Sequence, residues 1–104
     1  MGGQYLFSYH ISIENLSDSV VQLLSRHWYI FDSIGERREV QGDGVIGKQP
    51  VLQPGQIHEY GSWCPLTTPI GKMSGYYTMV KLDDDSFFDV SIPSFDLLGP
   101  AKLN

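Results

Sequence analysis

Apolar and polar residues alternate from the start of the chain. Tyr5, Phe7, Tyr9, Ile11 and Ile13 occupy the odd positions, and the even positions from 8 to 14 are polar. A period of two predicts a strand with one buried face. We expect this strand to end in the polar segment Asn15–Ser19, whose short side chains form hydrogen bonds with their own backbone in turns.

The run from Val20 to Asp32 changes parity midway, with Val21 and Leu23 on one parity and Trp28 and Ile30 on the other. The run is too long and too apolar for a simple edge strand, and a helix is the alternative. The aromatic and β-branched residues from 27 to 31 favour a strand. A β-bulge near residues 24–27 would then place both apolar pairs on one face.

Further strands are expected at Arg37–Gln41, Ile57–Ser62, Met73–Leu82 and Phe88–Ile92, with turns at Asp32–Glu36, Gln53–Gln56 and Asp83–Ser86. Gly35 and Gly55 supply the positive φ that the first two turns need. The buried parity of Met73–Leu82 stays open, because adjacent residues in it are both tyrosine.

Prolines are expected to interrupt the second half of the chain. Pro65 and Pro69 break the segment between Trp63 and Gly71, and Pro93 ends the pairing of the last strand, since proline lacks an N–H donor. Phe95 and Leu97 then fold back onto the core. About seven short strands, with turn signals every 8–12 residues and no helical spacing, predict an all-β antiparallel sandwich.

Length and charge narrow the function. A chain of 104 residues forms one domain, and its net charge of −5 disfavours binding to nucleic acids and to anionic membranes. The single cysteine, Cys64, excludes an intrachain disulfide, which suits a reducing compartment. No apolar run has the length of a membrane span, so we expect a cytoplasmic protein.

Glycine and proline crowd the segment Glu39–Gly55, where Gly42, Gly44 and Gly47 form a G-x-G-x-x-G pattern. Its main-chain N–H groups, with Lys48 as the nearest cation, are candidates for binding pyrophosphate or a nucleotide polyphosphate. The dinucleotide fingerprint needs a helix after the glycines, and the prolines that follow exclude one. We prefer a structural interpretation, in which the glycines provide positive φ and close packing.

Arg26, His27 and Trp28 are consecutive, and strand geometry puts Arg26 and Trp28 on one face and His27 on the other. We expect Trp28 in the core, because sandwiches commonly centre on a buried tryptophan. Arg26 is expected to stack on an aromatic ring or to pair with Glu39 or Asp43. A candidate interaction surface consists of Arg26, Arg37, Arg38 and Gln49.

Metal and catalytic sites find little support. The candidate ligands His10, His27, His58, Glu59 and Cys64 lack the spacing of a zinc site. We interpret Asp83–Asp85 as a solvated acidic turn. A catalytic Cys64–His58 pair would need hydrogen-bond contact, which nothing in the spacing enforces, so we expect Cys64 to be a semi-buried thiol. We therefore expect no catalytic residue, no metal site and no cofactor.

Ordered sequence pieces over nearly the whole chain resemble the ApaG family, a domain of unknown function. The pieces are IEN (13–15), VQLLSRHWYIFDS (21–33), EVQGDGVIGKQPVLQPG (39–55), YGS (60–62), GKMSGYY (71–77) and FDVSIPSF (88–95). The tail LLGPAKLN further resembles members from Bacteroidetes. The resemblance implies a fibronectin type III-like or immunoglobulin-like sandwich.

The resemblance also implies a function. The family occurs within eukaryotic F-box proteins and a DNA-polymerase-interacting protein, and bacterial members are linked to cobalt tolerance and magnesium efflux. We accordingly expect a non-enzymatic module that binds a protein partner and is linked to divalent-cation homeostasis, and a nucleotide-polyphosphate or pyrophosphate sensor using Gly42–Lys48 is the alternative.

The chain departs from the family at its N-terminus. Family members usually have a further strand before the position of Tyr5, so we expect residues 1–4 to be a start or cloning remnant and residues 5–104 to be the domain, without that strand. An unpaired sheet edge invites pairing between chains, which predicts a homodimer.

Overall fold

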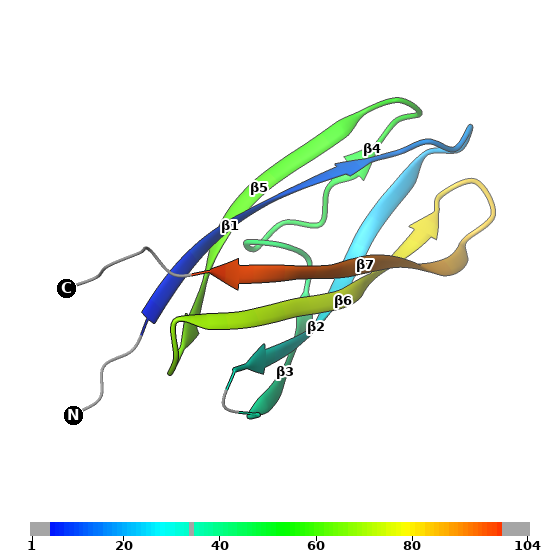
Figure 1. Cartoon of the computed structure of the whole chain (residues 1–104). Helices are drawn as coiled ribbons and strands as arrows, with labels where there is room; N and C mark the ends of the chain where they lie inside the picture. Colours follow the sequence, from blue (N-terminus) through cyan, green and yellow to red (C-terminus); the bar gives the residue numbers. More distant parts are fainter. Residues whose placement is uncertain (1–4, 34, 99–104) are drawn as a thin grey trace.

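The computed structural model describes residues 5–33 and 35–98, and these residues form strands and turns (Figure 1). The strands are β1 (Tyr5–Glu14), β2 (Val21–Asp32), β3 (Arg37–Asp43), β4 (Val51–Leu52), β5 (Ile57–Leu66), β6 (Ile70–Lys81) and β7 (Ser86–Leu98). The predicted all-β antiparallel sandwich is confirmed. The predictions about residues 1–4 and about the tail from residue 99 lie outside the described residues.

Two sheets form the layers of the sandwich (Figure 1). One sheet contains β1 and β5, and the other has the order β3-β2-β6-β7, with β4 pairing with one end of β2. Every recorded pairing is antiparallel. As a result β3 and β5 are both edge strands, each paired on one side among the described strands.

The first two strands form as their patterns predict. In β1, Phe7 and Ile13 are buried and the even positions are exposed. In β2, the register against β6 shifts between Leu23 and Ser25, which confirms the expected bulge. The shift brings Val21, Leu23, Trp28 and Ile30 onto the buried face, as the parity change required.

The predicted turns also form. Gly35 and Gly55 both have positive φ, at 93° and 85°. In the second turn, Gln56 N donates to the carbonyl oxygen of Gln53 at 2.9 Å, which together with the positive φ of Gly55 is the type II geometry. Strands β6 and β7 are joined by the acidic turn after Lys81, with Asp85 at φ 57°.

Two expectations about proline are wrong. β5 runs through Pro65 to Leu66, and β7 runs through Pro93 to Leu98. β5 and β7 are both edge strands, where a missing N–H need not break a ladder. Pro93 lies where the register between β6 and β7 shifts, between the pairs Met73–Phe95 and Gly75–Ile92. A bulge there accommodates the proline without ending the strand.

Strand bounds differ from expectation in the middle of the chain. β3 continues to Asp43, so Gly42 belongs to a strand. The short strand β4 at Val51–Leu52 was not predicted, because it lies within the glycine- and proline-rich segment. β6 begins at Ile70, before the expected Met73. In β6 the open question of parity is resolved, because Tyr77 is 2% exposed while Tyr76 lies on the outer face.

The core fills the space between the sheets. Trp28 is 2% exposed, which confirms its predicted place, and it makes edge-to-face contacts with Tyr9, Tyr77 and Phe95 at centroid distances of 5.7, 6.3 and 6.0 Å. Such contacts stabilise a core beyond the burial of area. Leu97 is buried and Phe95 packs against the same cluster, as expected.

A candidate binding pocket between two sheet edges

A pocket of about 370 Å³ opens between the edge strands β3 and β5, and we call it the edge pocket. Its apolar floor contains Trp28, Ile30, Val45 and Met73, its polar wall contains Tyr9, Arg26, Tyr60 and Ser62, and its rim contains Arg38, Val40, Ile46 and Trp63. The pocket exists because the two sheets close over the core but their edges on this side do not pair with each other.

Arg26 projects from β2 into the edge pocket. Its Nη1 donates to the carbonyl oxygens of Asp43 and Gly44, both at 3.0 Å. The expected pairing with the Glu39 or Asp43 carboxylate is therefore wrong. The reason is that Arg26 faces inward and contacts the backbone at the end of β3, whereas the Glu39 side chain lies on the opposite face of β3.

Glycine at position 42 makes room for this guanidinium. A Cβ atom at Gly42 would lie 2.8 Å from Nη1 of Arg26, closer than real Cβ contacts. A side chain at position 42 would therefore have to displace the end of the flexible Arg26 side chain from its present position. This is the close packing expected of the structural interpretation.

Residues Val45–Lys48 form a tight hairpin. Val45 N donates to Lys48 O at 2.8 Å and Lys48 N donates back at 3.0 Å, while Ile46 and Gly47 have φ of 48° and 71°, as in a type I′ turn. Gly44 N donates to Leu24 O at 2.8 Å. The N–H groups of Gly44, Val45 and Lys48 are therefore bonded within the fold and are not directed at an open site.

Tyr60 and Tyr77 link the two sheets beside the pocket, with their hydroxyl oxygens 2.6 Å apart. Burial raises the pKa of Tyr60 to about 12, and it also raises the pKa values of Tyr9 and Tyr77. All three phenols are therefore neutral at physiological pH. Neutral phenols keep O–H groups that can donate to an acceptor in the pocket.

Arg38 spans the pocket mouth. Its Nη2 donates to the carbonyl oxygen of Pro65 and lies 3.7 Å from Sγ of Cys64. Cys64 is 2% exposed, so it is more buried than the expected semi-buried thiol. Burial raises the pKa of this thiol despite the nearby guanidinium, which keeps it protonated and unlike a catalytic nucleophile.

The structure separates the residues of the predicted interaction surface. Arg26 and Arg38 line the edge pocket. Arg37 instead lies over the ring of Phe31, with Cζ 5.4 Å from its centroid, and the Gln49 amide donates to Leu24 O at 2.9 Å. Arg37 and Gln49 are thus occupied in contacts away from the pocket.

Strand geometry also separates the candidate catalytic pair. His58 and Cys64 point to the same side of β5 but pair with opposite ends of β1, at Ile13 and Phe7. Six residues of strand span about 20 Å, which excludes the hydrogen bond that such a pair needs. In residues 5–33 and 35–98 no three potential metal ligands gather at one point.

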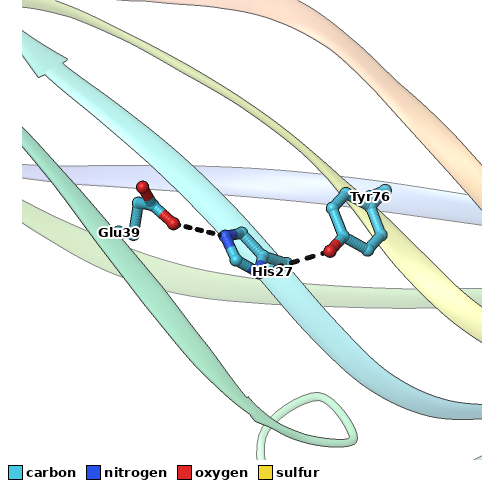
Figure 2. A network of polar contacts seen from close by, with 3 residues as sticks. All are labelled: His27, Glu39 and Tyr76. Atoms are coloured by element: carbon cyan, nitrogen blue, oxygen red, sulfur yellow. Dashed lines mark hydrogen bonds and ion pairs between the residues drawn. The ribbon is translucent and has the colours of Figure 1, made fainter.

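The outer face of the larger sheet carries a polar network (Figure 2). His27 Nε2 lies 2.8 Å from Glu39 Oε1, and Nδ1 lies 3.5 Å from the Tyr76 hydroxyl. Because a carboxylate only accepts, Nε2 is the donor. The imidazole also stacks on Tyr76 at 5.1 Å, so this trio is a set of cross-strand contacts that stabilises the sheet.

Tyr9, Tyr60 and Trp63 are pocket residues that sequence reasoning did not single out. Tyr9 has the inward parity of β1, which the alternation did predict. Trp63 is 62% exposed because it has the outward parity of β5, whose odd positions from 57 to 65 are all exposed. A tryptophan two residues before a proline was the available signal.

Comparison with known proteins identifies a matching family. The family model of the ApaG domain matches residues 2–81. Protein ApaG of Anaeromyxobacter dehalogenans is 51% identical over 102 residues, covering 98% of this chain and 81% of that protein. Protein ApaG of Bdellovibrio bacteriovorus is 47% identical over 102 residues, with 98% and 80% covered. The chain thus spans about four-fifths of the length of these relatives.

A solved structure shares the fold. The crystal structure of Northeast Structural Genomics Consortium target SoR45 has 42% sequence identity and a TM-score of 0.91, covering 97% of this chain and 78% of that one. Among the described residues, no helix is long and apolar enough to cross a membrane.

Proposed function

This chain belongs to the ApaG domain family, and we propose that it is a non-enzymatic module that binds a segment of a partner protein in the edge pocket. The observation that carries the proposal is an apolar pocket whose rim exposes a tryptophan. Trp63 is 62% exposed, and Ile46 and Val40 beside it are 57% and 37% exposed.

The composition of the pocket supports a protein partner. Tryptophan, tyrosine and arginine are the residues that most often dominate binding energy at protein interfaces, and all three occur here. A volume of about 370 Å³ accommodates one or two side chains of a partner. Such pockets favour binding when they exclude water around an anchor residue.

The flanking strands support an extended partner segment. β3 and β5 each have one edge without a partner among the described strands, and both edges border the pocket. An extended segment can add to a free edge through main-chain hydrogen bonds while its side chains enter an adjacent pocket. Pro65 limits this pairing at one end of β5.

The glycine pattern suggests one alternative role, and the family resemblance suggests another. A polyphosphate site at Gly42–Lys48 is less favoured, because Gly44, Val45 and Lys48 donate their N–H groups to carbonyl oxygens of the chain. A role in divalent-cation homeostasis is compatible with the proposal if the partner, such as a transporter, handles the ion.

A library of random peptides displayed with free C-termini tests the proposal directly. We expect panning against the wild-type domain to enrich peptides that bind less to the Trp63→Ala variant. Phe87→Ala is the matched control, because Phe87 is equally exposed at 68% but lies on β7 outside the pocket. No enrichment, or equal loss of binding in both variants, would overturn the proposal.

A further inference from the structure

We propose that the edge pocket recognises the free C-terminal residue of the partner segment, with its carboxylate on Arg26 and its side chain on the apolar floor. This inference rests on the proposed function and specifies which part of the partner enters.

The positive charge of Arg26 has no counterion in the described part of the chain. The two ion pairs among these residues join His10 to Glu59 and His27 to Glu39. The hydrogen bonds of Arg26 to described residues all come from Nη1 and go to neutral carbonyl oxygens. A guanidinium has five N–H donors, so Nη2 and Nε retain the paired donor geometry that fits a carboxylate.

Neutral hydroxyl groups complete the polar wall. Tyr9, Tyr60 and Ser62 line the pocket together with Arg26. The Tyr60 hydroxyl already pairs with that of Tyr77, and Ser62 forms a hydrogen bond with Tyr9, so part of this donor capacity is used within the fold. Arg26 is also close enough to favour the ionised form of Tyr9 and Tyr60, which places its charge near both phenols. Because burial dominates and keeps the phenols protonated, the wall offers one positive charge and several donors.

The match in charge favours a single carboxylate. One inward guanidinium in a mostly apolar pocket neutralises one negative charge, whereas a polyphosphate would bring several charges that remain unpaired and poorly hydrated. Arg38 also has no ion-pair partner among the described residues, but it lies at the pocket mouth, where its Nη2 donates to Pro65 O. The pocket interior therefore suits a ligand with one carboxylate.

The apolar floor favours a chain end over an internal acidic residue. Trp28, Ile30, Val45 and Met73 form a surface that a Glu or Asp side chain reaching Arg26 would leave largely uncovered. A C-terminal residue with an apolar side chain brings that side chain and a carboxylate to one place. A chain end also needs no exit from the pocket, unlike a segment that continues.

Two matched ligands test the inference without any mutation. We would titrate the ¹⁵N-labelled domain with N-acetylphenylalanine and with its C-terminal amide, following the Arg26 Nε–H and Trp63 indole N–H signals. We expect saturable chemical-shift changes with the acid. The amide should bind at least about tenfold more weakly, because it loses the charge-assisted pair with Arg26. Equal binding of acid and amide would overturn the inference.

Variants then assign the carboxylate to Arg26. We expect Arg26→Gln to reduce binding of the acid about tenfold, and Gly42→Ala to weaken it by displacing the guanidinium while the charge remains. Arg37→Gln is the control, since Arg37 lies outside the edge pocket. Unchanged affinity in a folded Arg26→Gln domain would show that Arg26 only holds the hairpin, and would overturn the inference.

The outcomes separate this inference from the proposed function. If enriched peptides bind equally well after C-terminal amidation, or bind through an internal Glu, the module function holds and the C-terminal assignment fails. If N-acetylphenylalanine binds in an Arg26-dependent manner but no peptide is enriched, the carboxylate subsite holds and the protein-binding function fails.

Discussion

Asp32 joins the end of β2 to the connection between β5 and β6, and its replacement by Asn gives a stringent test of the fold. The residue is 6% exposed. Its Oδ2 accepts from Thr67 N at 2.8 Å and from Thr67 Oγ1 at 2.7 Å, and its Oδ1 accepts from Thr68 Oγ1. The carboxylate therefore fixes the segment after Leu66 to the last residue of β2.

The expected loss can be worked from these bonds. Hydrogen bonds to a charged group contribute roughly 1.5–3 kcal/mol each, and neutral bonds about half as much. The Asn side chain keeps one acceptor oxygen, and its NH₂ group, a donor, replaces the oxygen that accepts from Thr68. Because Thr67 is exposed and water replaces part of the loss, we expect Asp32→Asn to lower the free energy of unfolding by about 2 kcal/mol. For a domain of this size that lowers Tm by roughly 8–16 °C.

The pH dependence provides an independent check. Burial alone raises the pKa of Asp32, but the hydrogen bonds from Thr68 and Thr67 outweigh burial and lower the pKa to about 2. A carboxyl with a lowered folded-state pKa stabilises the fold above its unfolded value of about 3.9, and loses that contribution as pH falls toward 2. The difference between wild type and Asp32→Asn should therefore shrink between about pH 4 and pH 2.

Urea unfolding followed by circular dichroism at several pH values measures both effects. Asp18→Asn is the control, because Asp18 is an exposed carboxylate in the turn before β2. A variant as stable as wild type at pH 7, or a difference that does not change down to pH 2, would refute the role assigned to Asp32.

Three further predictions concern the glycine pattern, ligands and assembly. Gly44→Ala should lower the free energy of unfolding in urea by about 3 kcal/mol, because its Cβ would clash with Lys48 O. Gly55 also has positive φ but has open space around it, so Gly55→Ala should lower the free energy of unfolding by about 1 kcal/mol. Equal losses in the two variants would refute the clash. Calorimetry should show no heat with pyrophosphate, and Co²⁺ or Mg²⁺ should leave Tm unchanged; a millimolar or tighter Kd for pyrophosphate would restore the anion hypothesis. Since β1 pairs with β5 alone among the described strands, we expect its other edge to pair with a second copy, and a monomer in light scattering at high concentration would contradict this.

Local patterns predicted much of the fold. The alternation from Tyr5 to Ile13 and the parity change in β2 were sufficient to predict a strand and a bulge, because both depend on near neighbours in sequence. Pro65 and Pro93 were misjudged because their effect depends on whether their strand is an edge strand. That is a property of the sheet as a whole, which periodicity does not contain.

The candidate site was predicted only in part. The parity rule placed Arg26 beside Trp28 on the inner face, and the structure confirms this. Its acceptors at Asp43 and Gly44 depend on where β3 ends, and the presence of Trp63 at the same pocket depends on how the two sheets stack. Contacts between sheets are fixed by tertiary packing, so a single sequence did not reveal the pocket.

Chemical-shift mapping of the ¹⁵N-labelled domain with an enriched peptide tests the central claim most directly. We predict that the largest changes fall on the Trp63 indole N–H, the Arg26 Nε–H and the other edge-pocket residues. If the largest chemical-shift changes were instead at Tyr29 and Tyr76 on the outer face, or along β7, they would contradict the claim that the edge pocket is the binding site.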